Sequence, residues 1–339
     1  MDIVIEAVAV PVVDSSQPGE ARRAAIAMAK QLGFDEAILG RVAVVATEAA
    51  TNIVKHGEGG EVLLRPLQDD GGECGIELLA LDRGPGMANL AESRLDGVSR
   101  SGTAGTGLGA IVRMADVHDI YSTPGHGTAL LARIWQTRRS MPRRSPLAVG
   151  GVSVATTGET VCGDGWAVTP DASGACILVT DGLGHGPDAA EASREAVRIF
   201  RMRAAEGPVA VLRFAHDALR STRGAAVAVA DIDCESGVIT FAGVGNVAGT
   251  ILADTGRRNM VSHNGTLGHA ARTFAEFTYP WASTALVVLN SDGLVSHWSL
   301  DAYPGITSRD ASLIAAVLYR DFTRGRDDTT VVVAKRASG

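Results

Sequence analysis

The chain has few cysteines and no excess of basic residues. Its four cysteines, among 339 residues, form no C-x-x-C pair. The sequence therefore indicates neither a zinc knuckle nor a disulfide framework, and it fits a reducing cytosol. The formal net charge is −7 at pH 7, whereas a protein that neutralises nucleic-acid phosphates needs a basic surface. We expect proteins and small molecules as partners, and no nucleic acid.

Long apolar runs are also missing. No window reaches the roughly 18 uninterrupted apolar residues that a membrane-spanning helix needs. The first 11 residues are mostly apolar, but they include Asp2 and Glu6 and lack the basic region of a secretory signal, so a strand is the better interpretation. These absences predict a soluble, cytoplasmic protein that does not associate with a membrane.

The length and composition allow about two domains, because 46% of the 339 residues are hydrophobic and each domain can bury its own core. Residues 137–146 contain four arginines, two prolines and two serines, which is the composition of a linker. The arginines could instead bind an acidic partner. We predict a first domain over residues 1–136, a linker over 137–147 and a second domain over 148–339.

Apolar periodicity and turn residues predict the secondary structure of both halves. The first half has the pattern of an α/β domain and the second is rich in strands with packed helices, so the predicted fold class is α/β (α+β). In the first half we expect helices at 18–32, 35–56 and 107–116, and strands at 61–66, 75–81, 118–122 and 128–135. In the second half we expect helices at 187–205, 208–221 and 308–323, and strands at 150–156, 165–169, 175–181, 225–233, 237–244, 248–253, 284–290 and 329–334.

A polar face on the helix predicted at 35–56 is the first candidate site. Glu48 and Asn52 are four residues apart, so both side chains emerge from one side of that helix. A solvated flank of an amphipathic helix would show the same pattern. Further along, three glycines, Gly105, Gly107 and Gly109, lead into a helix, whose free N–H groups attract phosphate. Neither the dinucleotide fingerprint nor a P-loop lysine is present.

A second glycine motif follows the strand predicted at 75–81. Asp82, Gly84 and Gly86 form an Asp-x-Gly-x-Gly sequence, which can present a carboxylate and bare backbone to a ligand. Taken alone, it is more often an ordinary turn.

These motifs, in this order and with the later Gly127-Thr128 pair, resemble the GHKL family of ATP-binding domains over residues 1 to about 136. The resemblance implies that Asp82 recognises the adenine amino group, that the glycines of both motifs let the chain fold around ATP, and that Thr128 contacts the adenine side. It also implies that Asn52 holds Mg²⁺ against the phosphates and that Glu48 orients or deprotonates the attacking hydroxyl. Within the family, the chain looks most like the small serine/threonine kinases of partner-switching and stressosome pathways, which include anti-sigma factors.

In the second half, carboxylates recur at strand ends. Asp181-Gly182 and Asp292-Gly293 each follow a buried strand, Asp327-Asp328 precedes the last strand, and Gly163-Asp164 precedes another. Oxygen ligands of this kind suit hard divalent cations. Each Asp-Gly pair alone is more often a turn, but four such sites in one domain are hard to explain as turns only.

Their order and flanking residues resemble the PPM class of metal-dependent protein phosphatases, and within it the SpoIIE-type serine phosphatases, over residues 148 to about 336. The resemblance implies that Asp181, the Gly182 carbonyl, Asp292 and Asp327 bind two Mn²⁺ or Mg²⁺ ions, with Asp164 supporting the site. Asp328 competes with Asp327 as a ligand, and the family motif favours Asp327. The implied architecture is a GHKL α/β sandwich followed by a PPM β-sandwich flanked by helices.

The two resemblances together imply a bifunctional regulator of a partner-switching pathway. Its first domain would be an ATP- and Mg²⁺-dependent Ser/Thr kinase and its second a metal-dependent phosphoserine/phosphothreonine phosphatase, both acting on STAS-domain regulators. Alternatively, the first domain is an anti-sigma factor that binds ATP and sequesters a sigma factor, or a nucleotide-sensing module that controls the phosphatase. The chain could also form a homo-oligomer.

Overall fold

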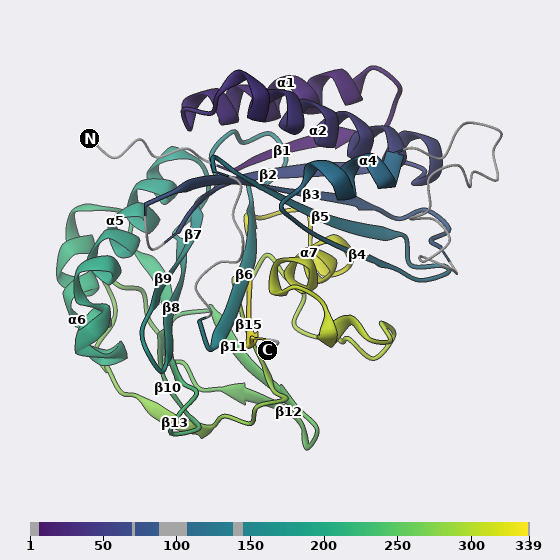
Figure 1. Ribbon diagram of the computed structural model, residues 1–339. Helices are drawn as coiled ribbons and strands as arrows, with labels where there is room; N and C mark the ends of the chain where they lie inside the picture. Colours follow the sequence, from purple (N-terminus) through teal and green to yellow (C-terminus); the bar gives the residue numbers. More distant parts are fainter. Residues whose placement is uncertain (1–6, 70–71, 88–106, 138–144, 338–339) are drawn as a thin grey trace. The chain divides into compact units, whose positions relative to one another are not determined.

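A computed structural model describes residues 7–69, 72–87, 107–137 and 145–337. The chain divides into two compact units. Unit 1 comprises Met1–Pro142 with Tyr303–Arg309, and unit 2 comprises Arg143–Ala302 with Asp310–Gly339. The predicted mixed α/β fold class is confirmed, since each unit combines sheets with packed helices (Figure 1).

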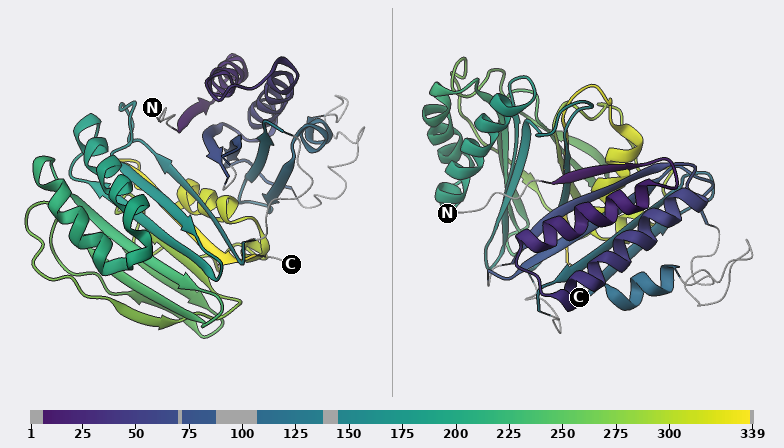
Figure 2. Two further views of the ribbon diagram at one scale, coloured as in Figure 1. Left: turned by 60° about the vertical axis from the view of Figure 1, so that its left-hand side comes forward. Right: turned by 90° about the horizontal axis from the view of Figure 1, so that it is seen from above.

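Unit 1 is a five-stranded antiparallel sheet with its helices on one face (Figures 1 and 2). Apolar residues of alternating strand positions pack against the helices and form one core, as expected for a sheet with one helix-covered face. The strand order is β1-β2-β3-β5-β4. The strands are β1 (Val8–Val12), β2 (Gly60–Gln68), β3 (Cys74–Asp82), β4 (Val117–Ser122) and β5 (Thr128–Trp135), and the helices are α1 (Gln17–Gln31), α2 (Glu36–His56) and α4 (Gly107–Met114).

Helix α2 is the central helix of this unit. Asp35 caps its start, accepting a hydrogen bond from the Ile38 backbone N–H at 2.8 Å, and Gly57 ends it with its own N–H bonded to the Ile53 carbonyl, which satisfies groups that a helix end leaves unpaired. With 21 residues, this helix is long and apolar enough to span a membrane, by length and composition only. Eight of them, however, are buried in the unit 1 core, so core packing accounts for its apolar stripe.

Unit 2 is a sandwich of two antiparallel sheets with helices outside (Figures 1 and 2). One sheet has the order β13-β10-β9-β8-β7 and the other β12-β11-β14-β15-β6. The strands are β6 (Leu147–Val154), β7 (Asp164–Pro170), β8 (Gly174–Gly182), β9 (Ala225–Asp233), β10 (Val238–Val244), β11 (Ala248–Ala253), β12 (Gly256–Met260), β13 (Phe277–Pro280), β14 (Leu286–Asn290) and β15 (Thr329–Arg336). Helices α5 (Pro187–Arg203) and α6 (Pro208–Ala218) pack on the first sheet, and α7 (Ala311–Phe322) packs on β6 and β15.

The layers explain the apolar runs of the sequence. Strand β8 is buried at every position from Gly174 to Thr180, because one face meets the second sheet and the other meets α5. Such a strand shows a continuous apolar run and no alternation. Two edge strands, β12 and β13, were not predicted. The first contains Gly-Arg-Arg-Asn and is exposed at all four of these positions, so it carries no apolar pattern that would indicate a strand.

Candidate active sites

Glu48 and Asn52 meet the start of α4 in unit 1. A Cβ atom added to Gly107 would lie 2.9 Å from Glu48 Oε2 and 3.2 Å from Asn52 Oδ1, so a larger residue here would displace these side chains. Asn52 Nδ2 is buried and has no hydrogen-bond partner. A buried, unpaired donor is costly, and a phosphate oxygen at the N-terminus of α4 would satisfy it.

Asp82 ends β3 and is 9% exposed. Its Oδ1 accepts hydrogen bonds from the backbone N–H groups of Gly84 and Thr128, both at 3.0 Å. Asp82 and Thr128, 46 positions apart in sequence, are therefore in direct contact. The Thr128 hydroxyl continues this network to Ser122 Oγ at 3.0 Å. Ser122, a buried residue that sequence reasoning missed, is adjacent to no motif that would have marked it.

Close backbone packing explains the glycines around Asp82. A Cβ added to Gly84 would lie 2.4 Å from the His56 carbonyl oxygen, and one added to Gly86 would lie 2.1 Å from the Thr123 carbonyl oxygen. A Cβ added to Gly57 would lie 2.5 Å from Asp82 Cβ. Gly86 also has φ +70°, a conformation that glycine adopts readily. Gly57 follows α2 directly, so the C-terminal end of this helix lies next to Asp82. Glu48 and Asn52 lie on the same helix, nearer to its N-terminus.

The remaining predicted residues of this site are two glycines on either side of Gly107. Gly109 lies buried in α4. Gly105 lies outside the described residues.

The carboxylates of unit 2 gather at one end of the sandwich. Asp164 starts β7 and pairs across the sheet with Asp181, near the end of β8. Burial, then the charges of Asp292 and Asp327, and then that of Asp328, raise the pKa of Asp181 to about 7. Burial and then the Asp181 charge raise the pKa of Asp164 as well. Such mutual effects are those expected of neighbouring carboxyl groups.

Each carboxylate has a different set of protein partners. Ser291 and Thr330 near Asp164 partly offset the rise in its pKa, and its Oδ2 is buried without a partner. Asp292 Oδ2 accepts a hydrogen bond from Asn246 Nδ2 at 2.6 Å. Asn246 thereby fixes the orientation of the Asp292 carboxylate.

The neighbours Asp327 and Asp328 differ in exposure. Asp328 is 2% exposed, and its two oxygens accept hydrogen bonds from the backbone N–H groups of Thr156 and Gly163, both at 2.7 Å. Asp327 is exposed, and its Oδ1 accepts from the Asp328 backbone N–H at 2.9 Å. Asp328 therefore ties together three segments of unit 2, while Asp327 faces the solvent side of the cluster.

Gly182, the last residue of β8, packs tightly against α5. An added Cβ would lie 2.1 Å from the Ala189 carbonyl, and its own N–H donates to the Gly163 carbonyl at 3.2 Å. This contact fixes the chain that follows Asp181. In the part of the chain that the structure describes, no three His, Cys, Asp or Glu side chains are already arranged as ligands of one metal ion.

Comparisons with known proteins identify both halves. Residues 13–134 match the histidine kinase-like ATPase domain, and residues 171–337 match stage II sporulation protein E (SpoIIE). The serine/threonine-protein kinase RsbT of Bacillus subtilis (strain 168) is 32% identical over 108 residues, which cover 32% of this chain and 80% of RsbT. The phosphoserine phosphatase RsbX of the same organism is 25% identical over 138 residues, which cover 40% of this chain and 69% of RsbX.

Two solved structures are similar to part of this chain. RsbX in complex with magnesium superposes with a TM-score of 0.50 at 21% identity, covering 58% of this chain and 98% of RsbX, which shows the shared fold. A second solved chain, described as "The bacterial stressosome: a modular system that has been adapted to control secondary messenger signaling", has a TM-score of 0.52 and 29% identity, covering 56% of this chain and 99% of its own length. The chain therefore belongs to the histidine kinase-like ATPase family, as a homologue of RsbT, and joins that domain to a SpoIIE-type phosphatase domain of the PPM class.

Proposed function

We propose that the protein is a bifunctional regulator in a partner-switching pathway. A kinase domain over residues 1–136 phosphorylates serine or threonine on a STAS-domain regulator, a linker spans 137–147, and a phosphatase domain over 148–339 removes phosphate from the same or a related regulator. The similarity to RsbT and RsbX supports this pairing. The protein would act in the cytoplasm, where such regulators work.

The acidic cluster of unit 2 is the observation that carries the phosphatase assignment. Burial and then the neighbouring carboxylates raise the pKa of Asp181 to about 7, and Asp164 keeps a buried oxygen without a partner. Like charges this close destabilise a fold unless cations lie between them. All the donors are oxygens, which fits Mg²⁺ or Mn²⁺.

In this proposal, Asp181, the Gly182 carbonyl, Asp292 and Asp327 hold two divalent cations. Asp164, opposite Asp181 on the neighbouring strand, supports the cluster. Bound cations would supply Lewis-acid activation of water and neutralise charge on the phosphoryl group. Asn246 fixes the Asp292 carboxylate by its 2.6 Å hydrogen bond.

In the kinase domain, Glu48, Asn52 and the start of α4 form the proposed phosphate end of an ATP site. Asn52 would bind Mg²⁺ and the phosphates, and its unpaired Nδ2 fits a phosphate oxygen. Glu48 would orient or deprotonate the attacking hydroxyl, since phosphoryl transfer depends on positioning and charge neutralisation. Asp82 and Thr128 would form the adenine end, where the carboxylate accepts a hydrogen bond from the exocyclic amine.

The proposal is tested by phosphate transfer with separated activities. Purified protein, labelled ATP, Mg²⁺ and a STAS-domain candidate are incubated with wild type, with Asp181→Asn to block hydrolysis, and with Glu48→Gln to block transfer. We expect labelled STAS protein to accumulate with Asp181→Asn and not with the Glu48→Gln/Asp181→Asn double variant. No label with Asp181→Asn would contradict the kinase assignment. Recovery of a sigma factor in ATP-dependent pull-downs would instead identify the first domain as an anti-sigma factor.

A further inference from the structure

A short segment from the second half of the sequence folds as part of unit 1. Residues Tyr303–Arg309 belong to unit 1, whereas the residues on both sides of them, Ala302 and Asp310, belong to unit 2. We call this segment the strap. None of its residues takes part in the two proposed active sites, so the two reactions do not explain why it packs in unit 1.

The first residues of the strap pack on the end of β4 and on the turn that follows it. The centre of the Tyr303 ring lies 6.5 Å from that of Tyr121 and 5.2 Å from that of His126, which are distances of aromatic contact. Tyr121 Oη donates a hydrogen bond to the Pro304 carbonyl at 3.3 Å. Tyr303 is 6% exposed, so loss of its ring would remove a buried contact.

The last residue of the strap forms an ion pair with β4. Arg309 Nη1 lies 3.3 Å from Asp119 Oδ1, and both side chains are partly buried. Asp119 and Tyr121 are two positions apart on β4, so their side chains emerge from the same face of this strand. The strap therefore contacts one face of β4 at both of its ends.

The same hairpin of β4 and β5 holds the proposed adenine end of the nucleotide site. Ser122 Oγ, next in sequence to Tyr121, lies 3.0 Å from Thr128 Oγ1. The Thr128 N–H donates to Asp82 at 3.0 Å, and His126 precedes Thr128 by two residues. The strap and a bound adenine would thus both act on one short hairpin, so each is expected to favour the hairpin position that the other requires.

Helix α7 starts where the strap ends. Asp310, the next residue, caps this helix by accepting a hydrogen bond from the Ser312 N–H at 2.9 Å. The helix is buried from Ala311 to Arg320, and it packs on β6 and β15. Because its 12 residues span about 18 Å, a movement of the strap would reach the far end of the helix through a rigid element.

The far end of α7 is hydrogen-bonded to the loop that follows Asp292. The Phe322 carbonyl accepts a hydrogen bond from the Val295 N–H at 2.9 Å, and the Arg324 N–H donates to the Gly293 carbonyl at 2.8 Å. Gly293 directly follows Asp292, which is a proposed metal ligand. The position of α7 therefore affects the chain that carries this ligand.

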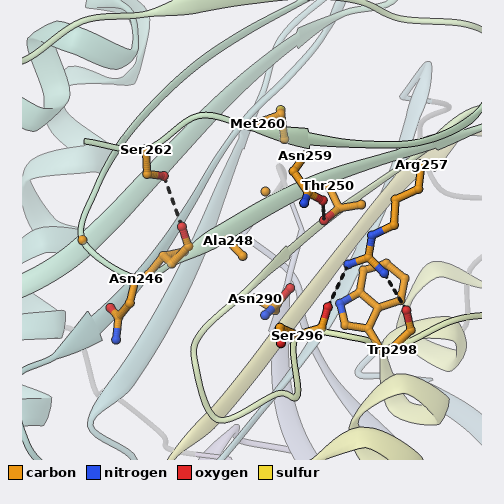
Figure 3. Close-up of a pocket in the computed structure, with 13 residues that line it drawn as sticks. Asn246, Ala248, Thr250, Arg257, Asn259, Met260, Ser262, Asn290, Ser296 and Trp298 are labelled. Carbon is orange, nitrogen blue, oxygen red and sulfur yellow. Dashed lines mark hydrogen bonds between the residues drawn. The ribbon is translucent and has the colours of Figure 1, made fainter. Parts of the chain in front are cut away.

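Arg257 braces the other side of this loop. Its guanidinium donates to the backbone carbonyls of Ser296 and Trp298, and its Cζ lies 4.1 Å from the centre of the Trp298 ring (Figure 3). Trp298 is 2% exposed, so this cation–π contact lies against a buried ring. With one side of the loop braced in this way, the α7 side is the one through which the strap would act on it.

We propose that the strap and α7 couple nucleotide binding in unit 1 to the phosphatase activity of unit 2. A nucleotide held by Asp82 and Thr128 keeps the hairpin and the docked strap in place, and the strap in turn restrains α7 and the loop after Asp292. A restrained ligand loses less conformational freedom when a cation binds, so a bound nucleotide raises phosphatase activity. The inference rests on the proposed nucleotide and metal sites.

The test measures kcat/KM of the full-length protein for p-nitrophenyl phosphate, with and without saturating AMP-PNP, at one fixed concentration of free Mg²⁺ or Mn²⁺. Isothermal titration calorimetry gives the affinity for AMP-PNP independently of the phosphatase reaction. Tyr303→Ala removes the ring that docks the strap. Insertion of two glycines between Arg309 and Asp310 leaves the docking contacts in place but breaks the rigid connection to α7.

Each variant has a matched control. Asp301→Asn changes an exposed residue just outside the strap. The same two glycines inserted between Glu235 and Ser236 lengthen the exposed turn between β9 and β10, away from the strap and α7 in sequence. Both controls should keep the wild-type response to AMP-PNP and the wild-type affinity for it.

We expect AMP-PNP to raise the wild-type kcat/KM about fivefold, at the lower end of typical couplings between sites. Tyr303→Ala and the insertion after Arg309 should both lose this response. Tyr303→Ala should also bind AMP-PNP about fivefold more weakly, because binding and docking favour each other to the same extent. The insertion variant should bind AMP-PNP within about twofold of wild type, because its strap stays docked.

A wild-type rate that does not change with AMP-PNP, or a response that survives the insertion after Arg309, would overturn the inference. Other outcomes bear on the proposed function instead. Wild-type protein that hydrolyses p-nitrophenyl phosphate with neither Mg²⁺ nor Mn²⁺ would overturn the phosphatase assignment, and wild-type protein that does not bind AMP-PNP would overturn the nucleotide site.

Discussion

Asp164 and Asp181 lie directly opposite each other on the paired strands β7 and β8. Like charges at directly opposed positions destabilise a sheet, and here burial and the neighbouring carboxylates raise the pKa of both residues. Two sheet strands thus hold an unfavourable charge arrangement in place, and the surrounding fold must be rigid enough to keep it. We therefore expect the stability of unit 2 to depend on bound cations.

We predict that Mn²⁺ or Mg²⁺ raises the thermal midpoint of unit 2 and that Asp181→Asn removes this effect. A ligand that binds only the folded state stabilises it by mass action, whereas the variant lacks one carboxylate of the cluster. In chelator at pH 8, the variant should also unfold at a higher temperature than wild type, because one repulsive charge is gone. Differential scanning calorimetry measures both effects. Asp254→Asn, an exposed carboxylate near Thr284, is the control and should respond to metal like wild type.

The two neighbouring aspartates before β15 should have separable roles. Asp327→Asn is expected to fold normally and to lose phosphatase activity by at least about a hundredfold, if it holds a cation. Asp328→Asn should lower the free energy of unfolding by about 1–3 kcal/mol, because an amide cannot accept as strongly from the N–H groups of Thr156 and Gly163. Urea unfolding and p-nitrophenyl phosphate hydrolysis distinguish them. Full activity of Asp327→Asn would show that the ligand assignment is wrong.

Gly107→Ala should weaken ATP binding without unfolding unit 1. The new methyl group would lie 2.9 Å from Glu48 Oε2, and a flexible carboxylate can move aside, so the fold survives while the phosphate end changes. We expect ATP affinity, measured by isothermal titration calorimetry, to fall about tenfold, which corresponds to about 1.4 kcal/mol. Gly40→Ala is the control on α2, where nothing lies within 4 Å of the added Cβ. It should bind ATP normally and stabilise the helix by about 0.5–1 kcal/mol.

Glu77 should make unit 1 sensitive to acid. The residue is 1% exposed, and although burial alone would raise its pKa, Arg65 and Arg133 outweigh burial and lower it to about 2. A carboxyl group with a lowered pKa in the folded state stabilises the fold above its unfolded pKa of 4.5 and loses this contribution as the pH falls towards 2. Glu77→Gln should therefore be less stable at pH 7 by about 3–5 kcal/mol, because two arginines lose their ion pair with this carboxylate.

The same variant should also depend less on pH between about 4.5 and 2 than wild type does. Thermal unfolding followed by circular dichroism across this range gives both values. Glu195→Gln, which removes an exposed pair with Arg198 on α5, is the control and should change little, since exposed pairs contribute little. Parallel pH curves for wild type and Glu77→Gln would contradict the prediction.

Periodicity was sufficient for most helices and strands because their apolar residues report which face is buried. The helix predicted at 35–56 is observed as Glu36–His56, and the strand predicted at 225–233 as Ala225–Asp233. Strand β12 was not predicted, because its position is fixed by main-chain pairing with β11 and most of its side chains are exposed. Local sequence cannot report a strand that depends on its neighbour.

For the candidate sites, sequence motifs identified the residues that end strands or begin helices but not the side chains that support them. Asp82 follows an apolar run and is flanked by glycines, so it is recognisable. Ser122 ends β4 and Ser291 follows β14, and no motif marks either position. Ser122 acts through its contact with Thr128 on β5, and Ser291 through its contact with Thr330 on β15. Such contacts arise only when the chain is folded.

Helix α2 also sets a spacing within unit 1. It carries Glu48 and Asn52, which face Gly107, and it is followed by Gly57, which packs against Asp82. A helix rises 1.5 Å per residue, so Glu48 and Gly57 are separated by about 14 Å along its axis. The helix therefore fixes the distance between the two ends of the proposed nucleotide site. Inserting one residue between positions 52 and 57 would turn the two ends by about 100° relative to each other, and no change of side chain could realign them.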